Sequence, residues 1–292
     1  MSHLFCFGAG FSAQALARTL LASGWTVTGT CRTPEAAHPL AAAGIAPVPL
    51  DTANPDGTAV AGALATATHI LVSVPPDGEG CPVARLFGEA IAERAGELRW
   101  LGYLSTTGVY GNRDGGWVDE RSALTPDTAR GHRRLAAEND WLALHGTRGV
   151  PVHIFRLAGI YGPGRNALEQ VASGRARRIV KPGQVFSRIH VDDIAGVLAA
   201  SIARPAPGTA YNVCDDEACP PQDVIAHAAR LLGVEPPPEI PFEEAGLSAM
   251  AASFYADNKR VANARIKREL GYSLSYPTYR EGLGALLSSV AA

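Results

Sequence analysis

The chain has 292 residues, of which 47% are hydrophobic and 18% charged, and its formal net charge is −2. A chain of this length can bury a large core, so we expect one large domain or two that pack closely. The small net charge gives no electrostatic reason to expect nucleic acid or a membrane surface as a partner, and no apolar run is long enough to span a bilayer.

The five cysteines argue against disulfides and against a metal site. Their number is odd and they form no Cys-x-x-Cys pair, so we expect reduced thiols in a cytoplasmic protein. Cys214 and Cys219 have no histidine at metal-ligand spacing, which argues against a zinc site. The segment 1–24 is apolar, but it lacks a basic start and is interrupted by Gly8, Gly10 and Gln14, unlike a signal peptide.

Apolar runs suited to strands alternate with stretches of helix formers through the first half of the chain. The expected strands lie at 4–7, 25–30, 45–50, 69–74, 100–105 and 152–157, and the expected helices at 12–23, 34–43, 81–96 and 128–145. This alternation predicts right-handed βαβ units. The expected fold class is therefore α/β, a Rossmann-like doubly wound parallel sheet with a smaller C-terminal lobe.

The turn after the first strand has the sequence Gly-Ala-Gly-Phe-Ser-Ala and fits G-x-G-x-x-G/A between a strand and a helix. Its first glycine would allow a tight turn, its second would let a pyrophosphate approach the backbone, and the alanine permits close helix–strand packing. The helix start adds free N–H groups and positive dipole charge. We therefore expect a dinucleotide cofactor to be bound by Gly8, Gly10, Phe11, Ser12 and Ala13.

The end of the second strand favours NADP as the cofactor, with NAD as the alternative. An NAD-selective site needs Asp or Glu near this point to bond the ribose 2′-OH, and the sequence has Thr30, Cys31 and Arg32 instead. Arg32 could pair with a 2′-phosphate. A solvated surface arginine is the competing interpretation.

The regular alternation ends after Gly159, where glycine and proline cluster over 162–164. Segments 189–203 and 211–213 predict one more helix and one more strand, which could rejoin the sheet. A Pro-rich linker at 236–241 precedes a charged helical tail. The predicted division is a dinucleotide-binding Rossmann domain at 1–160, rejoined by about 186–215, and a smaller substrate-binding lobe at 161–185 and 216–292.

Several segments beyond the glycine-rich turn carry a family resemblance that covers nearly the whole chain. They lie at 103–111, 156–165, 188–193, 259–261, 269–272 and 276–277. Together they resemble the extended short-chain dehydrogenase/reductase family, and within it the NAD(P)-dependent epimerases and dehydratases. The resemblance also implies a homodimer, since the family often pairs through the helices found here near 81–96 and 128–145.

The resemblance implies roles for residues at the strand ends. Thr106 would be the hydroxyl that bonds the reacting oxygen of the substrate, with a cap of the strand end as the alternative. Thr107 and Gly108 stand where sugar-nucleotide dehydratases have Asp-Glu, which argues against dehydration. Asp51 would lie near the adenine or cap a helix.

Two arginines in family-like segments are expected to bind the substrate. The family commonly has an arginine at the position of Arg188 that meets a substrate phosphate, and planar guanidinium suits bidentate phosphate binding. We assign Arg188 and Arg165 to an anionic substrate, together with Tyr161 from the segment that the family places beside the nicotinamide. Asp192 is expected to be a helix N-cap.

The likeness fails at the acid–base pair, a Tyr and a Lys four residues later in the family. Pro126 and the run 135–138 fix the register, and on it Arg130 replaces the Tyr and Arg134 replaces the Lys. A guanidinium has a pKa above about 12 and cannot exchange protons near neutrality. Two guanidinium groups one helical turn apart would also repel each other unless an anion lies between them.

Three interpretations follow from this replacement. Another acid–base group could act, with Tyr110, Tyr161 or His132 as the stand-in, if Arg130 or Arg134 lowers the pKa of a phenol from about 10. The chain could instead bind NADP(H) without hydride chemistry, as a sensor or interaction protein. Finally, the register could be wrong, which the match over 135–138 disfavours.

Thr106 and the arginines favour a substrate pocket. We therefore expect a protein similar to sugar-nucleotide epimerases and reductases, an atypical oxidoreductase or epimerase acting on an anionic small molecule. The inactive NADP(H)-binding sensor is the alternative, so whether the chain is an enzyme stays open at this point.

Overall fold

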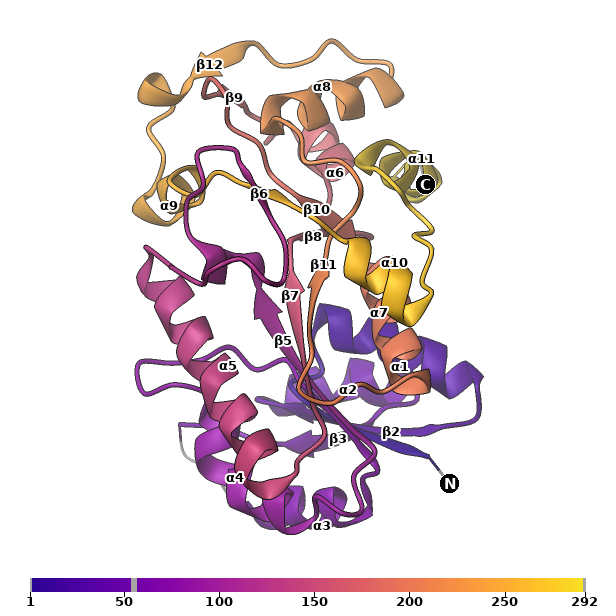
Figure 1. The fold of residues 1–292 in the computed structure, drawn as a ribbon. Helices are drawn as coiled ribbons and strands as arrows, with labels where there is room; N and C mark the ends of the chain where they lie inside the picture. The colour runs from indigo at the N-terminus through magenta and orange to yellow at the C-terminus, as the bar shows by residue number, and fades with distance from the viewer. Residues whose placement is uncertain (1, 54–56, 291–292) are drawn as a thin grey trace.

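The computed structural model describes residues 2–53 and 57–290 (Figure 1). Within these residues the main sheet has seven parallel strands in the order β11-β7-β5-β4-β1-β2-β3. The strands are β1 (His3–Phe7), β2 (Thr26–Cys31), β3 (Ala46–Pro49), β4 (His69–Val72), β5 (Trp100–Thr106), β7 (Val152–Leu157) and β11 (Ala210–Val213). The expected Rossmann-like parallel sheet is confirmed.

Helices cover both faces of this sheet because side chains alternate along each strand. In β1, Leu4 and Cys6 belong to one hydrophobic core, and Phe5 and Phe7 belong to the other. The first core packs under α1 (Phe11–Ala22), α2 (Pro34–Ala42) and α7 (Val191–Ala203), the second under α3 (Thr58–Thr66), α4 (Pro82–Glu93) and α5 (Ala129–Arg148). Burial on both sides explains why the strands read as nearly continuous apolar runs.

A smaller lobe lies beyond the arrowheads of β5 and β7 in Figure 1. Three short parallel pairs, β10 with β8, β12 with β9 and β13 with β6, connect it internally and to the sheet domain. The remaining elements are η1 (Thr107–Tyr110), β6 (Trp117–Val118), β8 (Gly159–Tyr161), α6 (Ala167–Ala172), β9 (Arg178–Val180), β10 (Arg188–His190), α8 (Pro221–Leu231), β12 (Glu239–Pro241), η2 (Phe242–Glu244), α9 (Ala249–Tyr255), β13 (Arg260–Val261), α10 (Ala264–Leu270) and α11 (Tyr279–Val290).

The start of α7 differs from the sequence prediction. Residues 188–190 form β10 beside β8, and the helix begins only at Val191. The imidazole of His190 caps it by accepting a hydrogen bond from the backbone N–H of Asp192 at 3.2 Å. The expectation that Asp192 is the N-cap is therefore wrong, and its carboxylate lies 3.5 Å from the guanidinium of Arg18.

β11 pairs with β7 at the edge of the sheet, so the chain returns to the sheet after the first lobe segment. α10 also packs on this layer, since Ile266 and Leu270 share the core that contains α7. We retain as a proposal the division into a Rossmann domain at 1–160 with about 186–215 and a lobe at 161–185 with 216–292.

Candidate functional site

A cavity of about 820 Å³ lies between the carboxyl ends of the strands and the lobe. This is the edge of a doubly wound sheet at which ligands generally bind. The structure brings most of the predicted site residues to its lining: Gly10, Phe11, Ser12, Thr106, Arg130, Arg134, Tyr161, Arg165 and Arg188. Gly8, Ala13, Arg32, Asp51 and Tyr110 are not among its lining residues.

The glycine-rich turn forms an open cradle at the start of α1. Gly8 has φ +84°, which favours glycine, and its N–H donates to Thr30 Oγ1 at 2.7 Å. Gly10 precedes the helix, and a Cβ added there would meet nothing within 4 Å. No side chain caps α1, and no acidic residue occupies its first turn. The free N–H groups at this helix start therefore suit a pyrophosphate.

Two residues that the sequence analysis missed shape this turn. Ser73, which lines the cavity after β4, donates its hydroxyl to the Gly8 carbonyl at 2.5 Å. Gly29 of β2 lets the turn pack closely, since a Cβ there would lie 2.6 Å from Ala9 Cβ. Ala13 is buried in the core beneath α1, so it serves packing as expected of a small residue at that place.

The two residues expected near the adenosine half of a cofactor are exposed. Arg32 follows directly after β2, and Asp51 follows β3. Asp51 Oδ1 accepts a hydrogen bond from the N–H of Ala53 at 3.0 Å, while Gly57 occupies the N-cap position of α3. Among the described residues Asp51 therefore closes a local turn, and the alternative that it caps a helix is not realised.

Thr106 lies at the end of β5, where its side chain caps the 3₁₀ turn η1 and the residue also lines the cavity. Its Oγ1 accepts a hydrogen bond from the N–H of Gly108 at 3.2 Å, which caps η1. A hydroxyl that accepts one bond can still donate its hydrogen. The two roles considered from the sequence are thus compatible, and Thr106 can offer a donor to the cavity.

Arg130 and Arg134 lie one turn apart on α5 but bind different groups. The guanidinium of Arg130 lies over the ring of Phe254, 4.3 Å from its centroid. Arg134 Nη1 donates to the carbonyl of Leu104 at 2.6 Å and to the hydroxyl of Tyr103 at 3.3 Å. The two side chains are held by separate partners, so the anion expected between them is not required to keep them in place. Neither can donate a proton at neutral pH.

Tyr110 is wrong as a stand-in for the catalytic Tyr. Its side chain is fully buried, and its hydroxyl donates to Asn212 Oδ1 at 2.7 Å while accepting from Arg156 Nη1 at 2.9 Å. Burial raises the pKa of Tyr110 despite the neighbouring arginine. His132 is exposed on α5 and does not line the cavity. Of the three stand-ins only Tyr161 lines it, and burial raises the pKa of its phenol well above the usual value.

A buried polar network lies behind the cavity. Glu138 of α5 accepts hydrogen bonds from Ser105 and from Nε and Nη2 of Arg156, the last at 2.8 Å. Arg156 extends this network to Tyr110 and Asn212. It ties together β5, β7, β11 and α5. Neither charged residue was singled out from the sequence, although both lie in segments that carry the family resemblance.

The cavity wall is strongly cationic. Its lining contains five arginines and one lysine but a single carboxylate, that of Asp257. Arg188 is half-buried and donates to the carbonyl of Phe186 and to Sγ of Cys219, both at 3.0 Å. Arg165, which also lines the cavity, is exposed. An anion is the ligand that this charge balance would attract.

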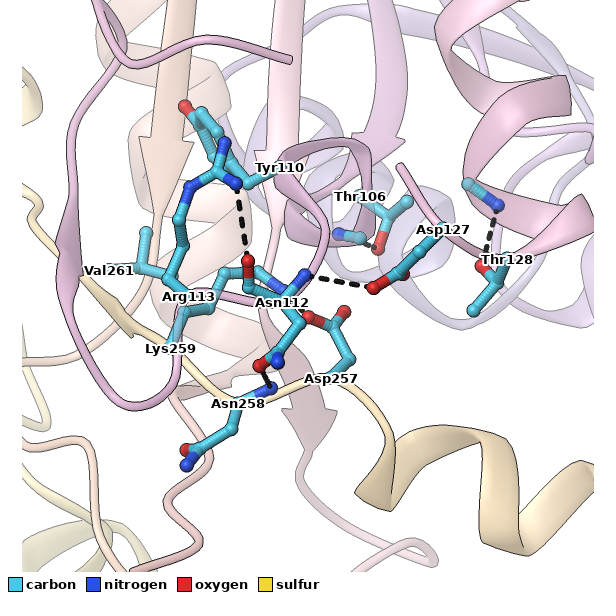
Figure 2. Close-up of polar contacts among 12 residues, drawn as sticks. Thr106, Tyr110, Asn112, Arg113, Asp127, Thr128, Asp257, Asn258, Lys259 and Val261 are labelled. Atoms are coloured by element: carbon cyan, nitrogen blue, oxygen red, sulfur yellow. Dashed lines mark hydrogen bonds and ion pairs between the residues drawn. The ribbon is translucent and has the colours of Figure 1, made fainter. Parts of the chain in front are cut away.

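Asp257 and Lys259 are charged cavity residues whose roles the sequence analysis did not anticipate (Figure 2). The Lys259 ammonium donates to Asp257 Oδ1 and forms an ion pair with it. Lys259 is only 7% exposed. The only sequence signal was the family-like segment 259–261, which carries no information about where the side chain lies.

In the described part of the chain, no helix combines the length and apolar character needed to cross a membrane. Nor do three or more His, Cys, Asp or Glu side chains gather there in a way that could hold a metal ion.

Comparison with known proteins places the chain in a family. The model of the NAD dependent epimerase/dehydratase family matches residues 85–214. Protein YeeZ of Escherichia coli K12 is 30% identical over 95% of this chain and 97% of its own length. A functionally unknown conserved protein from Silicibacter pomeroyi has a solved structure that is 51% identical, with a TM-score of 0.91 over the full length of both chains.

The fold extends to enzymes of low sequence identity. The dTDP-glucose 4,6-dehydratase of Bacillus anthracis, solved in complex with NAD, is 17% identical with a TM-score of 0.81, covering 99% of this chain and 96% of its own. This likeness concerns the fold alone. Taken with the full-length similarity to YeeZ and the family-model match, it leads to the conclusion that the chain belongs to the NAD dependent epimerase/dehydratase family.

Proposed function

We propose that this chain is an NADP(H)-dependent oxidoreductase or epimerase of atypical acid–base chemistry that acts on an anionic small molecule. The observation that carries the proposal is one continuous cavity. It joins the uncapped start of α1 to the hydroxyl of Thr106 and to a wall of arginines. A phosphate-binding helix start, a donor for a reacting oxygen and an anion-attracting wall are the parts that such a reaction needs.

The residues at the turn fit a nicotinamide dinucleotide. Gly10, Phe11 and Ser12 would hold the pyrophosphate through backbone N–H groups, because the space above Gly10 is open. Arg32, exposed at the end of β2, supports NADP over NAD by offering a cation to a 2′-phosphate. When bound, such a cofactor supplies or accepts a hydride.

The substrate would be bound by charge and by hydrogen bonds to its reacting oxygen. Arg165 and Arg188 are proposed to meet its anionic group, with Tyr161 lining the same space. Thr106 would donate its hydroxyl hydrogen to the carbonyl oxygen. Several structures of this fold are of enzymes named for nucleotide-sugars, such as the UDP-glucuronic acid 4-epimerase of Bacillus cereus, so nucleotide-sugars are the first class to test.

A second candidate is a protein that binds NADP(H) without turning over a substrate, as a sensor or an interaction partner. Arg130 and Arg134 favour it, because on the register that the resemblance implies they stand at the family's Tyr and Lys positions, and they cannot exchange protons near neutrality. Pairing of two chains through α4 and α5 is likewise a proposal.

Calorimetric titration of the full chain with NADPH and NADH, followed by a turnover screen, separates these candidates. The screen would follow oxidation of NADPH with UDP- and dTDP-keto-sugars and small carbonyl compounds, and epimer exchange with UDP-sugars. NADPH binding with turnover supports the main proposal. NADPH binding without turnover across the screen supports the second candidate, and failure to bind either dinucleotide overturns both.

A further inference from the structure

The proposed reaction needs a group that gives up and recovers a proton, and the resemblance implies an arginine, Arg130, at the position of the family's Tyr. The structure offers another such group in the cavity. We propose that Lys259 is the acid–base residue, with Nζ exchanging a proton with the substrate oxygen bound by Thr106, and that Asp257 positions it. This inference rests on the proposed function, in which that oxygen belongs to a carbonyl or hydroxyl group.

The first support is the direction in which the segment 257–261 presents its side chains. Asp257, Lys259 and Val261 line the cavity, whereas Asn258 and Arg260 do not. An extended chain sends alternate side chains to opposite sides. The carboxylate and the ammonium therefore share the side that faces the cavity, where Thr106 also lies.

The second support is that Asn258, which lies between Asp257 and Lys259, is hydrogen-bonded to two separate loops. The backbone N–H of Asn258 donates to Asn112 Oδ1 at 3.0 Å (Figure 2). The carbonyl of Asn258 accepts from the N–H groups of Arg113 and Gly115 at 2.9 and 3.0 Å. On the other side its Oδ1 accepts from the N–H of Val185 at 3.1 Å. Such anchoring fixes the backbone from which Lys259 reaches into the cavity.

Neighbouring backbone groups are held in the same way. The carbonyl of Asp257 accepts a hydrogen bond from Gln184 Nε2 at 3.0 Å. The N–H of Val261 donates to Ser187 Oγ at 3.2 Å. A general acid must be placed accurately to act. Lys259 is thus presented by a rigid segment, although it lies more than a hundred residues from Thr106 in the sequence.

The electrostatics suit proton exchange. Burial lowers the pKa of Lys259, while the carboxylates of Asp257 and Asp127 act in the opposite direction and Arg113 lowers it further. A lysine with a lowered pKa is a better acid near neutrality than an ordinary one. An ammonium has three donors, so the bond to Asp257 leaves others for a substrate oxygen.

The other cavity residues with a dissociable proton are less suitable. Burial raises the pKa of Tyr161, Tyr255 and Tyr279, all of which line the cavity. A phenol with a raised pKa is a weaker acid. The guanidinium groups of the cavity hold their protons at all relevant pH values.

In the reductive direction a bound dihydronicotinamide would supply a hydride to the carbonyl carbon, and the C=O double bond would become a C–O single bond. The oxygen gains the proton that leaves Nζ of Lys259, which gives an alcohol and a neutral amine. The amine then recovers a proton from solvent. In the oxidative direction the neutral amine would accept the hydroxyl proton, the oxidised nicotinamide would accept the hydride from the carbon, and the C–O single bond would become a C=O double bond.

A first experiment measures the titration of Lys259 without any cofactor or substrate. The sequence contains three lysines, at 181, 259 and 267, so ¹³C-lysine labelling gives few side-chain signals, assigned with K181R, K259R and K267R. The expected titration midpoint of Lys259 in the folded full chain lies below that of the same lysines in the denatured chain. A midpoint at or above the denatured value would overturn the inference.

A second experiment measures turnover of 9,10-phenanthrenequinone, a carbonyl probe without charge, with NADPH. Lys259→Met removes the proton donor and should lower kcat by about 100-fold or more, while NADPH binding stays within a few-fold. Lys259→Arg keeps the charge but not the exchangeable proton and should be equally impaired. Lys267→Met is the matched control, because Lys267 is partly exposed and pairs with Asp216, outside the cavity.

The outcomes separate this inference from the proposed function. If the wild-type chain turns over the probe and Lys259→Met does so equally well, the inference is wrong and the function stands. If Lys259→Arg restores turnover, charge rather than proton transfer is the role, and the inference is also wrong. A wild-type chain that binds NADPH but fails with this probe and with the whole substrate screen overturns the proposed function, and the inference with it.

Asp257→Asn tests the positioning role separately. Asn keeps the size of the side chain but removes the carboxylate charge beside the ammonium. The titration midpoint of Lys259 should fall further, because Asp257 acts to raise its pKa, and the pH profile of turnover should shift in the same direction. An unchanged midpoint would show that Asp257 does not position or stabilise the ammonium.

Discussion

The ion pair between Glu138 and Arg156 offers the sharpest test of what supports the site. Their side chains are 1% and 5% exposed, and Glu138 accepts from Nε and Nη2 of Arg156 and from Ser105. Removing one partner of a buried pair leaves an uncompensated charge and costs about 3–5 kcal/mol. Glu138→Gln should therefore lower the free energy of unfolding by about 3 kcal/mol or more.

Urea unfolding followed by circular dichroism gives this free energy. The matched control is Arg148→Ala, which breaks the exposed pair with Glu89 and should cost no more than about 1 kcal/mol. Replacing both buried charges, as Glu138→Leu with Arg156→Met, should recover much of the loss because no charge is left unpaired. Equal costs for Glu138→Gln and Arg148→Ala, or no recovery in the double variant, would refute the reasoning.

Three further predictions concern the cofactor site and the response to acid. Gly10→Ala should fold with unchanged stability, because its Cβ meets nothing within 4 Å, yet bind NADPH at least about 10-fold more weakly by calorimetry; Gly284→Ala, whose Cβ also meets open space, is the control. Arg32→Ala should weaken NADPH binding by about 10-fold or more and leave NADH binding unchanged, and equal weakening of both would contradict the preference for NADP. Burial lowers the pKa of His153 from 6.5 to about 4. As the pH falls, the unfolded chain therefore binds the proton before the folded chain does. Between about pH 6.5 and pH 4, His153 should lower the free energy of unfolding by about 3 kcal/mol. If the free energy of unfolding of His153→Gln depends on acid in the same way as that of the wild type, this reasoning is wrong.

The sheet could be predicted from the sequence because its strands are apolar on both faces and separated by helices of ordinary length. The start of α7 could not be predicted, because Ile189 continues the apolar pattern of the helix. Periodicity does not distinguish a short buried strand from the end of a helix. Only the pairing of β10 with β8 decides between the two.

Residues that line the cavity could be predicted where they lie at or just after the end of a strand, as Gly10 and Thr106 do. Tyr110 was misplaced because η1 intervenes: four residues after Thr106, this 3₁₀ turn returns the chain to the core, where Asn212 and Arg156 bind the phenol. Lys259 was missed for the opposite reason. Its place in the cavity depends on the pairing of β13 with β6 and on contacts to the loop near Asn112, none of which leaves a local pattern in the sequence.

The two arginines and the lysine belong to one arrangement. Arg134 binds the Leu104 carbonyl near the end of β5, and Arg130 binds the ring of Phe254 in α9. Five residues after Phe254 the same segment carries Lys259 into the cavity. The start of α5 therefore contacts the segment that carries the proposed proton donor. On the register that the resemblance implies, Arg130 and Arg134 stand at the family's Tyr and Lys positions. The proposed acid–base group, Lys259, then lies on the segment that Arg130 contacts and not on α5.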